Sequence, residues 1–315
     1  MIVQIVGDPK NYKEVEYIID EKQYKAYFAS KALRDNIYEK EGCYEKIILF
    51  IPESLLEEKY QRNLESFEKE IKVRGLEDFE LIEIPSIGEY KIGEERISYK
   101  YALDDVTVFI FLEFIKRKPD KILADVSTGQ NVYVFALIES IRRYVTYRQL
   151  ERILQEPPKL EVKIATYQPI TKDVKRAKIE IRPFYTRSFF QLPEAKPDKL
   201  HKSNGEKVGK IGERYKEAKS KFRKVQEKLT IAYNSIRYNI PLAFYQILNF
   251  EDDIESLEES MVDFVKEYLR SEVSVDLREV SNVFFSIAMF KSFKEFRNSL
   301  FLSEAKVSEI KDKFS

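Results

Sequence analysis

The sequence predicts an α/β protein in which a mainly parallel, doubly wound sheet is followed by an all-helical domain. In the first half, short apolar runs of strand length alternate with stretches of helical periodicity. Strands separated by helices need crossover connections, which make a sheet mainly parallel. From about residue 211 the periodicity is helical to the end. We therefore predict a sheet domain over residues 1–190, a linker over 191–210 and a helical domain over 211–315.

Six apolar runs are the predicted strands of the sheet. They are Ile2–Val6, Lys46–Ile51, Phe79–Ile84, Lys121–Val126, Val162–Tyr167 and Ile179–Phe184. The predicted helices between them are Lys22–Tyr38, Leu55–Val73, Tyr101–Lys116 and Asn131–Tyr144. Pro52 closes the second strand and Pro119 follows the third helix, since proline supplies no N–H to continue either structure.

Residues 186–210 lack apolar periodicity and contain two prolines, so we expect a linker there. In the helical part, residues 211–239 form one long helix or two, and helices follow over residues 252–269 and 277–301, with a short one after them. The last long helix carries a group of phenylalanines that is either core or a dimer surface, with core favoured by the spacing. The group is Phe284, Phe285, Phe290 and Phe293.

Composition excludes several classes of protein. The formal net charge of the 315 residues is zero, which does not indicate a generally basic nucleic-acid binder. Cys43 is the only cysteine and His201 the only histidine. We therefore expect no disulfide, no metal site built on several Cys or His, and no cofactor. His201 is expected to be a solvated linker side chain.

No signal peptide and no 18-residue apolar run is present, so we expect a cytoplasmic protein without membrane contact.

Two loops follow predicted strands at the edge where ligands bind in doubly wound sheets. The first contains Gly7, Asp8, Asn11 and Tyr12. Glycine, aspartate and proline favour a turn here, and Asn11 or Tyr12 can face a ligand, to hydrogen-bond or stack on a base. The alternative is that these residues form only a connecting turn.

The second loop runs from Asp125 to Asn131, between a strand and a helix. Backbone N–H groups at a helix amino end favour an anion. Ser127 and Thr128 add hydroxyl groups, and Gly129 allows a ligand to approach the backbone closely. These features suit a phosphate or a ribose. The alternative is an ordinary turn in which Ser or Thr caps the helix.

Three segments of the first half resemble the opening of a known family. They read GDPKNY at 7–12, YFASKAL at 27–33 and IPESL at 51–55. They are similar to the CARF-HEPN ribonucleases of type III CRISPR systems, in which the CARF domain is a Rossmann-fold sensor. DVSTGQN at 125–131 resembles the family motif Asp-(Leu/Ile)-Thr-His-Gly-(Thr/Ile)-Asn. Ser127 stands in place of Thr and Thr128 in place of His, which bears on ligand cleavage and specificity.

The helical half carries the segment EFRNSLFL at 295–302, which resembles the HEPN ribonuclease motif Glu-Phe-Arg-Asn-x-x-x-His. The resemblance makes Arg297 and Asn298 the catalytic candidates. Leu302 stands in the His position and cannot transfer a proton. His201 is no substitute, because the residue five positions before it is Lys196 and not Arg. Alternatively, Arg297 and Asn298 lie on a helix surface in a structural dimer contact.

The resemblance implies a sensor that binds cyclic oligoadenylate, with cyclic tetra-adenylate as the favoured ring, at the interface of a homodimer. The implied binding residues are Gly7, Asp8, Asn11, Tyr12, Ser127, Thr128, Gly129 and Asn131. Whether the chain is an enzyme stays open: it is a sensor with an inactive ribonuclease domain, a ring nuclease that cuts its ligand, or a ribonuclease of single-stranded RNA with residual activity. A transcription factor is disfavoured, because the last hundred residues lack the turn signals of a winged-helix hairpin.

Overall fold

The computed structural model describes residues 1–56, 63–92, 95–128, 131–168, 170, 174–186, 191–202, 206–240 and 253–300. By contacts, these residues divide into two compact units. The first comprises residues 1–141 and 160–185, and the second comprises residues 142–159 and the described residues from 186 onward. The predicted domain boundaries at 190 and 210 stay predictions.

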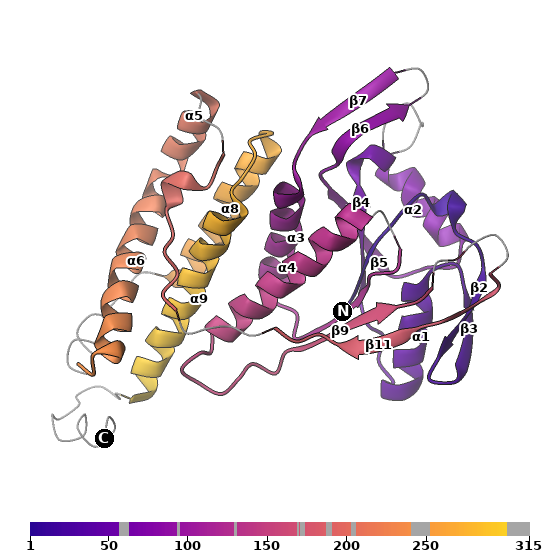
Figure 1. Ribbon diagram of the computed structural model, residues 1–315, viewed down its shortest axis with the longest axis horizontal. Helices are drawn as coiled ribbons and strands as arrows, with labels where there is room; N and C mark the ends of the chain where they lie inside the picture. Colours follow the sequence, from indigo (N-terminus) through magenta and orange to yellow (C-terminus); the bar gives the residue numbers. More distant parts are fainter. Residues whose placement is uncertain are drawn as a thin grey trace. The chain divides into compact units, whose positions relative to one another are not determined.

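A six-stranded sheet forms the centre of the first unit (Figure 1). Its strands are β1 (Ile2–Ile5), β4 (Ile47–Pro52), β5 (Phe79–Ile84), β8 (Lys121–Asp125), β9 (Glu161–Thr166) and β11 (Glu180–Pro183). They lie in the order β11-β9-β8-β1-β4-β5. All neighbours are parallel except β11, which runs antiparallel to β9. The mainly parallel α/β sheet is thereby confirmed, and its order reverses direction between β1 and β8.

Helices cover both faces of this sheet. On one face, α1 (Ala29–Glu41) and α2 (Leu64–Val73) pack against alternate residues of β1 and β4 in the main apolar core. On the other face, Phe50 of β4 contacts Phe114 of α3 (Leu103–Arg117). The Ser140 hydroxyl of α4 (Asn131–Leu150) donates a hydrogen bond of 2.7 Å to the Thr107 carbonyl of α3. This two-sided cover explains why the central strands read as uninterrupted apolar runs.

The helix predicted over Lys22–Tyr38 is wrong in its first part. Lys22–Ala26 is strand β3, antiparallel to β2 (Val15–Ile19), and β10 (Arg176–Lys178) completes this three-stranded sheet. Along β3, Tyr24 and Ala26 are buried while the residues between them are exposed, which is the two-residue period of a strand. The turn before it, Asp20-Glu21, has positive φ at both residues but lacks the Asn-Gly or Asp-Gly signal of a hairpin.

Two further differences concern the segment between β4 and α3. The helix predicted over Leu55–Val73 begins at Leu64, because the Asn63 side chain caps it by accepting a hydrogen bond of 2.8 Å from the Ser66 N–H. Residues 57–62 lie outside the described residues. The sequence analysis also missed a hairpin of β6 (Ile87–Ile92) and β7 (Glu95–Lys100), which extends away from the sheet (Figure 1).

Helices make up most of the second unit over its described residues. Its helices are α5 (Glu206–Arg214), α6 (Lys216–Arg237), α8 (Ile254–Arg270) and α9 (Leu277–Leu300), together with the end of α4. Residues 211–239 therefore contain parts of two helices. Of the phenylalanine group, all but the partly buried Phe285 have 0% exposure, so core was the right choice. The short helix predicted after residue 301 lies outside the described residues.

His201 is not the solvated side chain that we expected. It is partly buried, its backbone pairs with Val275, and its ring centroid lies 5.4 Å from that of Tyr268. Segment 191–202 packs on helices of its unit through such contacts: the Lys196 N–H, for instance, donates a bond of 2.9 Å to Glu279. No helix among the described residues is long and apolar enough to span a membrane.

Candidate functional site

The two loops singled out from the sequence lie side by side at the point where the strand order reverses. Gln4 of β1 pairs in register with Asp125 of β8, so both loops leave the sheet at the same level. The Gln4 amide donates a hydrogen bond of 2.7 Å to the Thr128 hydroxyl, which donates one of 3.3 Å to the Ile5 carbonyl. Thr128 thereby connects the second loop to β1, the strand that precedes the first loop.

The first loop is held by its own side chains. Pro9–Asn11 form a short 3-10 helix, η1, capped by Asp8, which accepts a bond of 3.0 Å from the Lys10 N–H. The Gly7 N–H donates a bond of 3.1 Å to the Tyr12 hydroxyl, and the Tyr12 ring packs 4.7 Å from the Phe28 ring. Tyr12 therefore faces inward and supports the loop, whereas Asn11 is exposed.

The second loop is held in a similar way. The Ser127 N–H donates a bond of 3.0 Å to Asp125 Oδ1, and the Ser127 hydroxyl accepts one of 2.8 Å from the Tyr167 N–H. Asn131 is exposed at the first position of α4. Gly129 lies outside the described residues. The hydroxyl groups of Ser127 and Thr128 thus hold the described part of the loop in place, and Asn131 faces solvent.

Asp125 is the residue beneath this site that the sequence analysis did not assign a role. It has 0% exposure, and burial raises its pKa to about 7, because the charged form loses its hydration. The Ser127 N–H bond and the nearby Ser127 and Thr128 side chains act in the opposite direction. A polar residue ending a buried strand is a signal visible in the sequence, but the depth of burial comes only from the fold.

Positive charge at the site comes from the first loop. Lys10 and Lys13 are both exposed, and Lys10 lies 3.7 Å from the Glu70 carboxylate in a loose ion pair. Together with the amino end of α4, whose backbone N–H groups carry partial positive charge, these lysines favour an anionic ligand. No group of His, Cys, Asp or Glu suited to a metal ion exists in the part of the chain that the structure describes.

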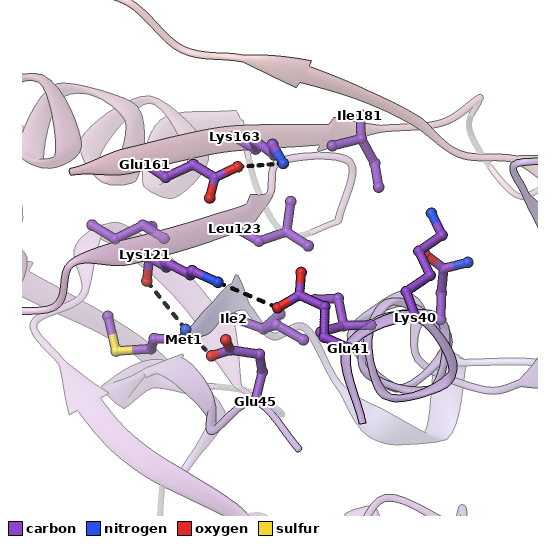
Figure 2. A pocket seen from close by; sticks show the side chains of 13 residues that line it. Met1, Ile2, Lys40, Glu41, Glu45, Lys121, Leu123, Glu161, Lys163 and Ile181 are labelled. Atoms are coloured by element: carbon purple, nitrogen blue, oxygen red, sulfur yellow. Dashed lines mark hydrogen bonds and ion pairs between the residues drawn. The ribbon is translucent and has the colours of Figure 1, made fainter. Parts of the chain in front are cut away.

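A cavity of about 140 Å³ lies at the opposite edge of the sheet, at the amino ends of β1, β8 and β9 (Figure 2). Ile2, Leu123 and Ile181 are among its apolar residues. Several of its charged residues are paired with one another: Lys121 with Glu41 at 3.2 Å, and Lys163 with Glu161. A ligand there would have to compete with these pairs. The edge with the two loops is therefore the better candidate.

Comparison with known protein families identifies the domain to which this edge belongs. Residues 1–169 match the model of the CARF domain of the CRISPR system endoribonuclease Csx1. The chain belongs to this family. No curated protein matches the chain. The match covers both loops of the CARF domain and all strands of the sheet except β11. It ends before the helical unit, whose identity as a HEPN domain therefore stays a prediction.

The ribonuclease candidates of this CARF protein lie near the end of α9. Asn298 is exposed and Arg297 partly buried, and an Arg297 guanidinium N–H donates a long bond of 3.5 Å to the Asn298 side chain. Glu295 accepts a bond of 2.7 Å from Gln155. Leu302, in the position of the motif histidine, lies outside the described residues. Their catalytic role stays a prediction.

Proposed function

We propose that this CARF protein is a sensor that binds cyclic oligoadenylate, cyclic tetra-adenylate by preference, at the edge between β1 and β8. The observation that carries the proposal is the meeting of the two loops where the strand order reverses, with Thr128 bonded to both Gln4 and Ile5. Ligands of doubly wound sheets bind at this place. The ligand is a ring of nucleoside phosphates, which suits an edge with exposed lysines and a helix amino end.

The roles of the proposed residues follow from their positions. Asn11 and Asn131 are exposed and offer amide groups to ribose or base. Gly7, Asp8 and Tyr12 hold the first loop through the bonds described above. Ser127 and Thr128 hold the second loop in place through their hydrogen bonds, and Gly129 follows them in the sequence of this loop. Lys10 and Lys13 supply cations for the phosphates.

The ring has approximate two-fold symmetry. Two copies of one site, related by the two-fold axis of a homodimer, can therefore bind its two halves in the same way. The start of α4 supports this arrangement. Phe135 is 56% exposed, and Val134 and Ile138 beside it are only partly buried. A helix that is apolar on its outer side as well as its inner side is normally covered. Because this outer side begins directly after the second loop, a second copy packed there would bring its own loops to the same ring.

Isothermal titration with cyclic tri-, tetra- and hexa-adenylate tests the proposal. We expect micromolar or tighter binding of one ring per dimer. Asn131→Ala and Asn11→Ala should each weaken it about tenfold through loss of a hydrogen bond to the ligand. Lys163→Ala, at the opposite edge, is the matched control and should leave the affinity unchanged. Absence of heat with all three rings at micromolar protein would refute the function.

A ring nuclease is the second candidate, favoured by the exposed lysines of the first loop. A ribose 2′-OH held in line with the adjacent phosphorus can displace the 5′-oxygen, which leaves as a 5′-OH and leaves a 2′,3′-cyclic phosphate behind. Positioning alone lowers the barrier of such a reaction. Incubation of the protein with the ring, followed by chromatography, distinguishes linear products from intact ligand. Lys13→Ala should slow product formation if the lysine stabilises the phosphate.

A further inference from the structure

The buried carboxyl group of Asp125 lies directly beneath the proposed site, and its hydrogen bonds are incomplete. Oδ1 accepts the Ser127 N–H, whereas Oδ2 is buried without a hydrogen-bond partner among the described residues. The amide oxygen of its register partner Gln4 is likewise buried and unpaired. Unpaired buried acceptors are rare and costly, and they concentrate at sites with a function.

The groups that face Asp125 are neutral. They are Tyr12 after η1, Tyr17 of β2, Tyr167 after β9, and the hydroxyl groups of its own loop. Burial raises the pKa of each of the three tyrosine hydroxyls, and the nearby carboxylate raises it further. The Asp8 carboxylate also raises the pKa of Tyr12. None of the described lysines or arginines forms an ion pair with Asp125, so a negative charge there is not neutralised.

We propose that Asp125 is a positioning residue that takes up a proton when an anionic ligand binds to the two loops, so that ionisation of Asp125 opposes binding. The inference rests on the proposed function, because it needs a phosphate ligand at this edge. The physical reason is that two negative charges in a site of low dielectric repel each other strongly. Since the protonated form is neutral and can donate a hydrogen bond through Oδ2, it is compatible with both the loop and the ligand.

The direction of the pH dependence follows from the raised pKa. Below about pH 7 the free protein holds the proton already, and binding is strongest. Above about pH 7 the free protein is ionised, so binding has to bring a proton from solvent. The dissociation constant should then rise with pH, by up to about tenfold per pH unit.

Titration calorimetry of the full chain with cyclic tetra-adenylate at pH 7.5, in phosphate and in Tris buffer, measures the proton directly. The two buffers differ in ionisation enthalpy, so a difference in the observed heat gives the number of protons taken up. We expect uptake of roughly half to one proton per site in the wild type. Asp125→Asn should take up none and bind with the same affinity from pH 6 to pH 8.5.

His201→Gln is the matched control, because it removes the only histidine of the chain and lies in the second unit. It should take up as many protons as the wild type. Binding of the ring without proton uptake, and with a dissociation constant independent of pH, overturns the inference and leaves the proposed function standing. Absence of binding at every pH overturns both. If Asp125→Asn does not fold, the wild-type pH profile and the His201→Gln control decide the question.

Discussion

The Thr128 side chain makes two hydrogen bonds to β1 from the loop that follows β8. The Thr128 hydroxyl accepts a hydrogen bond from the Gln4 amide and donates one to the Ile5 carbonyl. These two bonds hold the second loop against β1. In the related motif a histidine stands at this position. A histidine there would not reproduce both bonds of the hydroxyl in the same space. The departure from the motif therefore changes how the loop is anchored, and at the proposed site it changes which groups would face a ligand.

Thr128→Val tests this anchor at the scale of one residue. The change keeps the shape of the side chain but leaves the buried Gln4 amide unpaired, which should lower the free energy of unfolding by about 1–3 kcal/mol. Urea unfolding measures the effect. Thr166→Val, an exposed threonine at the end of β9, is the control and should have no measurable effect. Equal stability of the two variants would show that the anchor contributes nothing.

Among the elements, α4 joins the candidate site to the helical unit through one continuous helix. It begins with Asn131 of the second loop, and its last residues belong to the second unit. There the Tyr147 hydroxyl donates to Glu258 of α8, and the Lys291 ammonium of α9 lies 2.9 Å from Glu258. Burial raises the pKa of Tyr147 well above its usual value. These contacts hold three helices together through groups that are largely buried.

Phe135→Glu tests the role of the outer side of α4. A charge in an apolar interface between copies is strongly unfavourable, so the variant should be monomeric and should bind the ring at least tenfold more weakly. Light scattering after gel filtration measures the mass, and calorimetry the affinity. Val73→Glu, at an apolar residue with 78% exposure at the end of α2, is the matched control. A dimer that survives Phe135→Glu would place the interface elsewhere.

Lys291→Met tests the buried contacts of the second unit. Removal of the ammonium leaves the carboxylate of Glu258 buried without its cation, which should cost about 3–5 kcal/mol of stability. Thermal unfolding followed by circular dichroism measures the loss. Lys210→Met removes an exposed ion pair on α5 and should leave the midpoint unchanged. A small effect of Lys291→Met would mean that water reaches the cluster.

For the whole molecule, the equal numbers of acidic and basic residues argue against a surface that attracts RNA by charge alone. Any ribonuclease activity has to come from a local site, for which Arg297 and Asn298 are the described candidates. If segment 295–302 is the HEPN motif that it resembles, Leu302 stands in place of the histidine, and general acid–base help of this kind is typically worth about 10²–10⁴-fold in rate.

We therefore expect the protein to cleave single-stranded RNA very slowly or not at all, with or without cyclic tetra-adenylate. Leu302→His should increase ligand-dependent cleavage by about 10²-fold or more if the remaining residues still form the site. Arg297→Ala in the Leu302→His background is the control and should abolish the gain. Cleavage is measured with a fluorescent RNA substrate. Strong activity of the wild type that is lost in Arg297→Ala would show instead that the site works without a histidine.

The sequence by itself determined the class of fold and the edge of the sheet at which we propose the site. Long apolar runs such as Ile47–Pro52 can only be buried strands, and the small and polar residues after Val6 and Asp125 mark the ends of two of them. Strand β3 was misread because its exposed lysines and glutamine also suit a helix, and only pairing with β2 decides between the two.

The tertiary structure alone decided what the side chains at the site do. Tyr12 turned inward because the Phe28 ring lies behind it, and Ser127 and Thr128 bond to the protein because Tyr167 and Gln4 come within reach. The depth of Asp125 follows from β1 and β9 on either side of β8. Such contacts join residues up to 124 positions apart, and local patterns in a sequence carry no information about them.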